Sequence, residues 1–214
     1  MSSLSEAARR SGRARGSAAA VVGFFAAGWF GWAMAVDLRR PLTVLLDAAI
    51  VVALVVAVLG AVLAVRSPAE SSALADRAVR RRYTLVVVVE FAVIWAGAAV
   101  LGNTGLSAWI PVWVCFAVGV HFVPSAGVLG ESSLTVLGAL LVVVAAAGLV
   151  VGLTTTVAPG TVTGIGAGGC LLAAAVLTLA GKRFSGRRTP GPVDQRGSED
   201  SASPAGAPRR RNHS

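Results

Sequence analysis

The sequence predicts an all-α membrane protein: a polytopic transmembrane bundle of six helices with its N- and C-termini in the cytoplasm. Composition is the first observation, since 55% of the 214 residues are hydrophobic and only 14% are charged, against about a quarter charged in soluble domains. The second is segregation, because the charged residues lie mostly in the two ends and the loops. The third is length: six apolar stretches approach the roughly 20 residues needed to cross hydrocarbon.

The six expected spans follow one another through short connections. They cover residues 17–36, 42–65, 83–102, 106–124, 134–152 and 160–181. Little more than Asn103, Thr104 and Gly105 separates the third span from the fourth. These are turn residues, so the two spans should form an antiparallel hairpin. Pro159 and Gly160 mark the entry to the sixth span.

Polar segments flank this transmembrane domain, which covers residues 17–183. Residues 1–16 form a basic N-terminal segment that we expect to be disordered. Residues 184–214 form a basic tail rich in Gly, Pro, Ser and Arg. Such a tail cannot bury enough apolar surface to offset the entropy of ordering, so disorder is predicted there too.

The second loop carries a helix signal of its own. Ser67 is a favourable N-cap, Pro68 suits the first helical position, and Glu70 completes a capping box. We therefore predict a cytoplasmic helix over residues 68–83 that continues into the third span. Tyr83 and the arginines before it would then lie at the lipid headgroups, as interface anchors do.

The distribution of basic residues predicts the orientation, because Lys and Arg concentrate in cytoplasmic loops. The N-terminal segment holds four of them, the second loop five and the C-terminal tail eight, against two in the first loop. These clusters would also contact anionic lipid headgroups, which accounts for the net charge of +9 without nucleic acid. The excess of Arg over Lys indicates a GC-rich bacterial genome, and hence a bacterial plasma membrane.

The first span has a second interpretation. A basic start, an apolar stretch and the sequence Ala33-Met34-Ala35 resemble a cleavable signal peptide. The apolar run is long for such a peptide, and bulky Trp29 and Trp32 lie close to the cleavage site, so a retained span is preferred. Cleavage would leave the topology of the other spans unchanged.

Small residues are expected to hold the spans together, because lipid removes the hydrophobic incentive for helices to associate. Gly160, Gly164 and Gly168 recur every four residues in the sixth span and share one face. Glycine costs helix stability unless something packs against it. This face is therefore a predicted helix-packing surface, either within the bundle, which is preferred, or between subunits. Less distinctive small-residue runs occur at Gly23, Ala27, Gly31 and Ala35, at Ala53, Ala57 and Ala61, and at Gly148 and Gly152.

Three ionisable residues lie inside the expected spans: Asp47, Glu90 and His121. Charged groups in a bilayer are costly and usually face the protein interior, so each is a functional candidate. Asp47 lies near the outer end of the second span, close enough to pair with Arg39 or Arg40 or to stay hydrated. Glu90 and His121 lie at similar depths on the two arms of the hairpin, which makes them a candidate intramembrane polar pair.

The pair has three open interpretations. The preferred one is a polar clamp that holds the third span against the fourth. In the second, His121 reaches the headgroups while Glu90 meets Arg80 or water. In the third the pair titrates, because a carboxylate stabilises a neighbouring imidazolium.

Motifs for chemistry do not appear. The sequence contains no HExxH, GxSxG or GxxxxGK[ST] motif. Cys115 and Cys170 lie in apolar spans without a CxxC partner. We therefore expect no catalytic residue, cofactor or metal site. The leading hypothesis is a non-enzymatic structural or interaction bundle with a protein partner or a second copy of itself. The alternative is a small proton-linked transporter or channel that uses Glu90 and His121.

One stretch resembles a known pattern. Residues 109–111 (Trp-Ile-Pro) and 119–124 (Gly-Val-His-Phe-Val-Pro) follow a span that bears Glu90. This resembles an uncharacterised family of small bacterial multi-helix integral membrane proteins with a Gly-x-His-Phe-x-Pro helix end. The resemblance covers roughly residues 80–126. It implies a multi-helix membrane bundle and no activity, and it links Glu90 with His121.

Overall fold

The computed structural model describes residues 2–36, 38–67, 77–129 and 131–181. They form six α-helices and contain no strand, so the described chain is all-α, as predicted. A short 3-10 helix, η2 (Ser107–Trp109), leads into the fourth α-helix. The helices are α1 (Ser2–Ala33), α2 (Arg40–Arg66), α3 (Arg77–Asn103), α4 (Ile110–Leu129), α5 (Ser132–Thr154) and α6 (Pro159–Leu179). All six are long and apolar enough to cross a membrane, as a multi-pass membrane protein requires.

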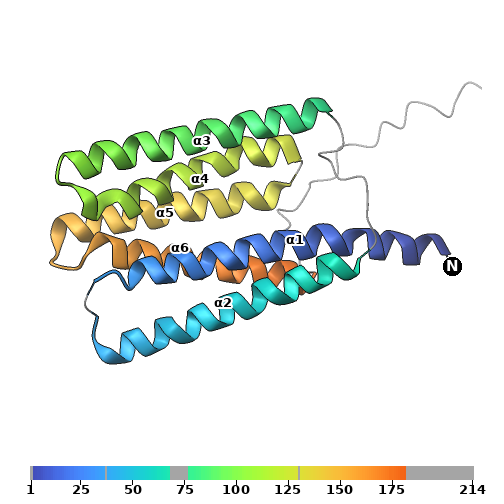
Figure 1. Ribbon diagram of the computed structural model, residues 1–214, viewed down its shortest axis with the longest axis horizontal. Coiled ribbons are helices and arrows are strands. Elements are labelled where there is room, and N and C mark those ends of the chain that lie inside the picture. The colour runs from blue at the N-terminus through green and yellow to red at the C-terminus, as the bar shows by residue number, and fades with distance from the viewer. Residues whose placement is uncertain (1, 37, 68–76, 130, 182–214) are drawn as a thin grey trace, which may run out of the picture.

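The helices run alternately in opposite directions and lie roughly side by side (Figure 1). Contacts link α2 to α1, α1 to α6, α6 to α5, α5 to α4, and α4 to α3. This order places α2 and α3 at opposite edges of the bundle (Figure 1). Gly105, with a φ of 76°, makes the turn between α3 and α4, so these two helices form the expected antiparallel hairpin.

The buried core excludes α3. Its side chains come from the other five helices, and none of the described side chains of α3 is buried. The core also contains many alanines, as expected where lipid leaves close backbone approach as the main source of packing. Its larger members are Trp29, Phe30, Leu46, Val112, Leu137, Leu141 and Leu171.

Paired glycines bring two helix pairs into close contact. A Cβ added to Gly16 of α1 would lie 2.6 Å from the carbonyl oxygen of Gly60 in α2. A Cβ on Gly119 of α4 would lie 2.9 Å from the carbonyl oxygen of Gly138 in α5. Neither pair was among the predicted packing runs, and Gly31, which was, has nothing within 4 Å of an added Cβ. The glycines at these seams allow backbones to approach where a side chain would separate them.

The N-terminal prediction needs correction. Disorder was expected for residues 1–16, whereas α1 begins at Ser2 and continues through this segment into the first span. The segment is rich in alanine and arginine, which are good helix formers. It also has a neighbour: a Cβ on Gly12 would lie 2.7 Å from Ser67 Oγ, beyond the end of α2.

The fourth span is also longer than predicted. Its end was placed at Pro124, but α4 continues to Leu129 with Pro124 inside it. Proline is tolerated within membrane helices because neighbouring groups satisfy the backbone that it frees. The extension adds Ser125 and Ala126 to the buried side of α4.

The cytoplasmic helix predicted over residues 68–83 is described in part. From Arg77 the chain is helical without interruption into the third span. Residues 68–76, which include the predicted helix start, lie outside the described residues. The tail predicted to be disordered, 184–214, lies outside them as well.

Candidate intramembrane polar site

The structure brings Glu90 and His121 into direct contact. Nδ1 of His121 on α4 lies 3.2 Å from Oε2 of Glu90 on α3. The two side chains are 9% and 12% exposed respectively, so other residues of the protein cover most of each side chain. A short turn joins these antiparallel helices and holds them side by side. Two residues at the same depth on the two helices can therefore touch.

A third polar group completes the site. Nε2 of His121 lies 3.0 Å from Oγ of Ser125, one turn further along α4. Ser125 is only 3% exposed. Ser125 was not among the predicted site residues, because the fourth span was expected to end at Pro124. The signal in the sequence is its four-residue spacing from His121, which places the two side chains on one helix face.

The three groups can satisfy one another in two protonation states. In the neutral imidazole, the protonated Nδ1 can face Glu90, and Nε2 accepts a hydrogen bond from the hydroxyl of Ser125. In the imidazolium, both ring nitrogens donate, and Ser125 Oγ becomes an acceptor. A buried polar group without a partner is expensive, so this arrangement keeps His121 paired whether or not it carries the extra proton.

A second polar contact joins the same two helices. Nε1 of Trp113 on α4 donates a hydrogen bond of 3.3 Å to the carbonyl oxygen of Val93 on α3. The indole ring occupies the space that a side chain at Gly97 would fill. The ring of Trp113 therefore lies in the seam between α3 and α4. Glu90, Val93 and Gly97 share the face of α3 that meets α4.

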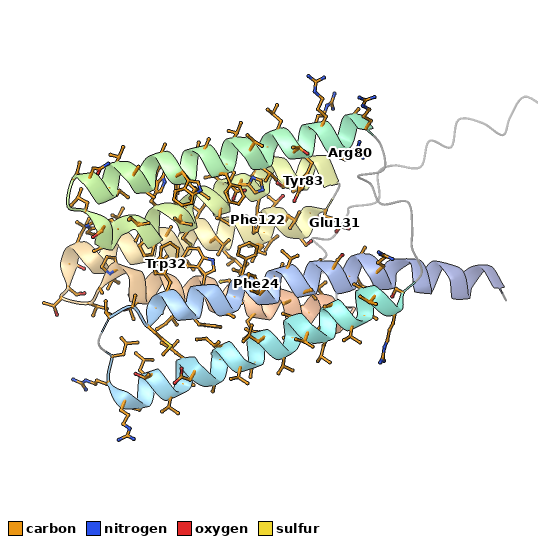
Figure 2. All side chains as sticks on the ribbon, viewed as in Figure 1. Phe24, Trp32, Arg80, Tyr83, Phe122 and Glu131 are labelled. Carbon is orange, nitrogen blue, oxygen red and sulfur yellow. The ribbon has the colours of Figure 1, made fainter. Side chains whose placement is uncertain are left out.

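The polar pair lines a groove between α3 and α4 with a volume of about 380 Å³. Aliphatic side chains of α3 and the rings of Trp113 and Phe116 on α4 form most of its wall. Arg80, labelled in Figure 2, lies at the end of α3 where that helix begins. Ten residues separate it from Glu90, about 15 Å along a helix. The group next to the Glu90 carboxylate is therefore His121 rather than this arginine.

Asp47 does not join the site. Its side chain is exposed on α2, at the opposite edge of the bundle from α3. Of its two expected states, pairing with Arg39 or Arg40 and hydration, the described residues show no ion pair with either arginine.

The glycine face of the sixth span divides between two neighbours. A Cβ on Gly164 would lie 2.7 Å from the carbonyl oxygen of Trp29, and one on Gly168 would lie 2.7 Å from the ring of Phe30, both on α1. A Cβ on Gly160 would instead meet Pro111 of α4 at 3.1 Å. In the described chain all three glycines therefore face other helices of the same bundle.

Across the part of the chain that the structure describes, no group of three or more His, Cys, Asp or Glu side chains is placed to hold a metal ion. Comparisons of the chain with protein-family models, with curated proteins and with solved structures found no match.

Proposed function

We propose that this chain is a non-enzymatic interaction bundle of the bacterial plasma membrane. It binds a partner within the bilayer, either another membrane protein or a second copy of itself, through the edge helix α3. One observation carries the proposal: directed polar contacts fix the rotation of α3, although none of its described side chains is buried.

Fixed polar contacts within a bilayer cost free energy. A helix that merely fills space beside lipid gains nothing from a fixed rotation, because lipid presents the same surface to every face. Intramembrane ionisable groups are expensive and usually have a role. In coiled coils, buried polar groups are known to set the register of helices. The Glu90–His121 contact and the Trp113 hydrogen bond set which face of α3 points away from the bundle.

That outward face is large and aromatic. Val88, Phe91 and Trp95 follow one another at three- and four-residue spacing and therefore share a face. They are 57%, 55% and 70% exposed respectively. Aromatic anchors dominate the binding energy of many interfaces. We call these three residues the outer face of α3, and assign partner binding to it.

The distribution of basic residues supports the membrane and the orientation. Arg66 ends α2 and Arg77 begins α3, on the side of the bundle where α1 also begins (Figure 1). Arg40 begins α2 at the other end. By the positive-inside rule the more basic end, with both termini, lies in the cytoplasm. Its arginines contact anionic headgroups there.

The polar site contains the same three groups, in the same order, as the catalytic triad of a serine hydrolase, but its hydroxyl group is buried. Carboxylate, imidazole and hydroxyl follow one another as in serine hydrolases. In such an enzyme the hydroxyl must meet the substrate, yet Ser125 is buried and is not among the residues that line the groove. Glu90, which would stand behind the imidazole, lines it instead. This inverted exposure supports a structural use of the site rather than acyl transfer.

Photo-crosslinking in native membranes tests the proposal. A photoreactive amino acid at position 95 should give a discrete protein adduct, and mass spectrometry then shows whether the partner is another protein or a second copy. The matched control is position 58 on α2, whose valine is 61% exposed at the other edge. Equal yields of lipid adducts alone at both positions would contradict partner binding through α3.

A second candidate function is proton-linked transport. The observation that favours it is the series of polar contacts Glu90–His121–Ser125, which begins at the groove and in which His121 can take up or release a proton. Proton flux in liposomes that is lost in Glu90→Gln would support transport. The interaction bundle predicts the same flux for the wild type, for Glu90→Gln and for empty liposomes.

A further inference from the structure

The Glu90 carboxylate has one oxygen that the polar pair does not use. Oε2 is the atom that meets His121. Among the described residues, Oε1 has no hydrogen-bond partner. In the described part of the chain, the only fully buried side-chain oxygen or nitrogen without a hydrogen-bond partner is Oγ1 of Thr161, so Oε1 of Glu90 is not fully buried. Oε1 is therefore accessible, and Glu90 lines the groove between α3 and α4.

The wall of this groove suits a particular kind of ligand. Trp113 and Phe116 line it, with ring centroids 6.3 Å apart and planes inclined at 38°. Aromatic faces attract cations, most strongly where water is scarce. The remaining wall is almost entirely aliphatic. The volume of about 380 Å³ lies within the range of small-molecule sites.

We propose that the α3–α4 groove binds a hydrophobic organic cation, such as a quaternary ammonium or phosphonium with apolar substituents. The Glu90 carboxylate is its counter-charge, and Trp113 and Phe116 form the aromatic wall beside the cationic centre. His121 and Ser125 hold the carboxylate in place from behind. This site goes beyond partner binding, since it lies on the inner side of α3 and not on the outer face of Val88, Phe91 and Trp95.

Other ligand classes fit less well. An anionic lipid would be repelled by the carboxylate. A neutral acyl chain would fit the apolar wall but would provide no counter-charge for the Glu90 carboxylate. A small metal cation needs several oxygen ligands in place of its water, and the groove has one carboxylate among apolar side chains. The last arginine of α3, Arg82, is eight residues or about 12 Å along the helix from Glu90, so the carboxylate keeps its negative charge when His121 is neutral.

The test uses the full chain in lipid nanodiscs and radiolabelled methyltriphenylphosphonium, with binding to empty nanodiscs subtracted. We expect saturable binding of about one cation per chain. Glu90→Gln should weaken it at least tenfold. Asp47→Asn removes the other intramembrane acid and should leave binding unchanged. Phe116→Leu should weaken binding about fivefold, because it removes one aromatic face from the cation.

A neutral analogue separates charge recognition from simple partitioning. Triphenylphosphine oxide resembles the probe in shape but carries no net charge, so it should compete poorly. The proposal is overturned if saturable binding is absent, if Asp47→Asn loses as much as Glu90→Gln, or if the neutral analogue competes equally. If Glu90→Gln does not fold, Phe116→Leu and the competition decide: unchanged binding in that variant, with equal competition, also overturns it.

Discussion

His121 shows how one side chain can serve two helices. One ring nitrogen faces the carboxylate of Glu90 on α3, and the other faces the hydroxyl of Ser125 on its own helix. The hydroxyl therefore orients the ring that reaches across the seam. This is the role of a second partner behind a functional histidine, which selects the tautomer through the hydrogen bond that it makes.

Ser125→Ala should free the imidazole ring of His121 to rotate, because it removes the hydroxyl that orients the ring. Nε2 then loses its partner in a buried place, so the free energy of unfolding should fall by about 1 kcal/mol. Nitrogen NMR of His121 in bilayers should show a changed balance between the two tautomers. Ser107→Ala, at an exposed serine of η2, is the control and should change neither quantity. An unchanged His121 spectrum in Ser125→Ala would contradict the role given to the hydroxyl.

The sequence predicted the pairing of Glu90 with His121, but it did not predict the contacts of Ser125 and Trp113 beside them. The short turn at Gly105 and the equal depths of the two residues were visible in the sequence, and they sufficed to predict a pair. Ser125 was missed because Pro124 was taken as the end of a helix, a rule made for water-soluble proteins. The place of Trp113 in the seam could not be predicted, because the space that Gly97 leaves for its ring is visible only in three dimensions.

At the scale of the element, the sixth span shows what a spacing can and cannot predict. A four-residue repeat of glycine fixes a helix face, and the structure has Gly160, Gly164 and Gly168 against other helices. It does not identify the neighbour, and the face in fact meets α1 at two glycines and α4 at the third. The seams at Gly16–Gly60 and Gly119–Gly138 were missed, because Gly60, Gly119 and Gly138 have no other glycine four residues away and so belong to no repeat.

Gly164→Ala should loosen the contact of α6 with α1. The added methyl would lie 2.7 Å from the carbonyl oxygen of Trp29 and 2.8 Å from the backbone nitrogen of Ala33, and backbone cannot rotate away. We expect a loss of about 1–3 kcal/mol in the free energy of unfolding, as in other overpacked sites.

Gly169→Ala is the matched control in the same helix. An added Cβ there has nothing within 4 Å, so the better helix propensity of alanine should leave stability unchanged or raise it by up to about 1 kcal/mol. Denaturant titration in mixed micelles measures both variants. Equal effects at positions 164 and 169 would show that α6 does not pack on α1 at Gly164.

At the scale of the whole molecule, the lateral order α2–α1–α6–α5–α4–α3 was beyond prediction. A soluble helix shows its buried face as a stripe of apolar residues. In this chain lipid-facing and protein-facing positions are both apolar, so the number and lengths of the spans can be predicted while their neighbours cannot. The edge position of α3 thus emerges only from the contacts.

The orientation can be tested on intact cells with a membrane-impermeant maleimide. Thr104→Cys, in the turn between α3 and α4, should react from outside. Arg77→Cys, at the start of α3, should react only after the cells are opened. Both positions are exposed in the structure, and the unmodified chain, with Cys115 and Cys170 inside helices, reports the background. The reverse pattern would place the termini outside the cell.

The edge position also makes α3 dependent on its seam with α4, since it packs chiefly on that helix and contributes no described side chain to the core. The most direct test is a double-mutant cycle with Glu90→Gln, His121→Ala and the two combined, read as free energies of unfolding in a bilayer or bicelle. If the pair fastens α3 to α4, the combined loss should fall short of the sum of the single losses by about 0.5–1.5 kcal/mol. Single losses that simply add would show that the two residues do not act together, and the account of α3 would fail.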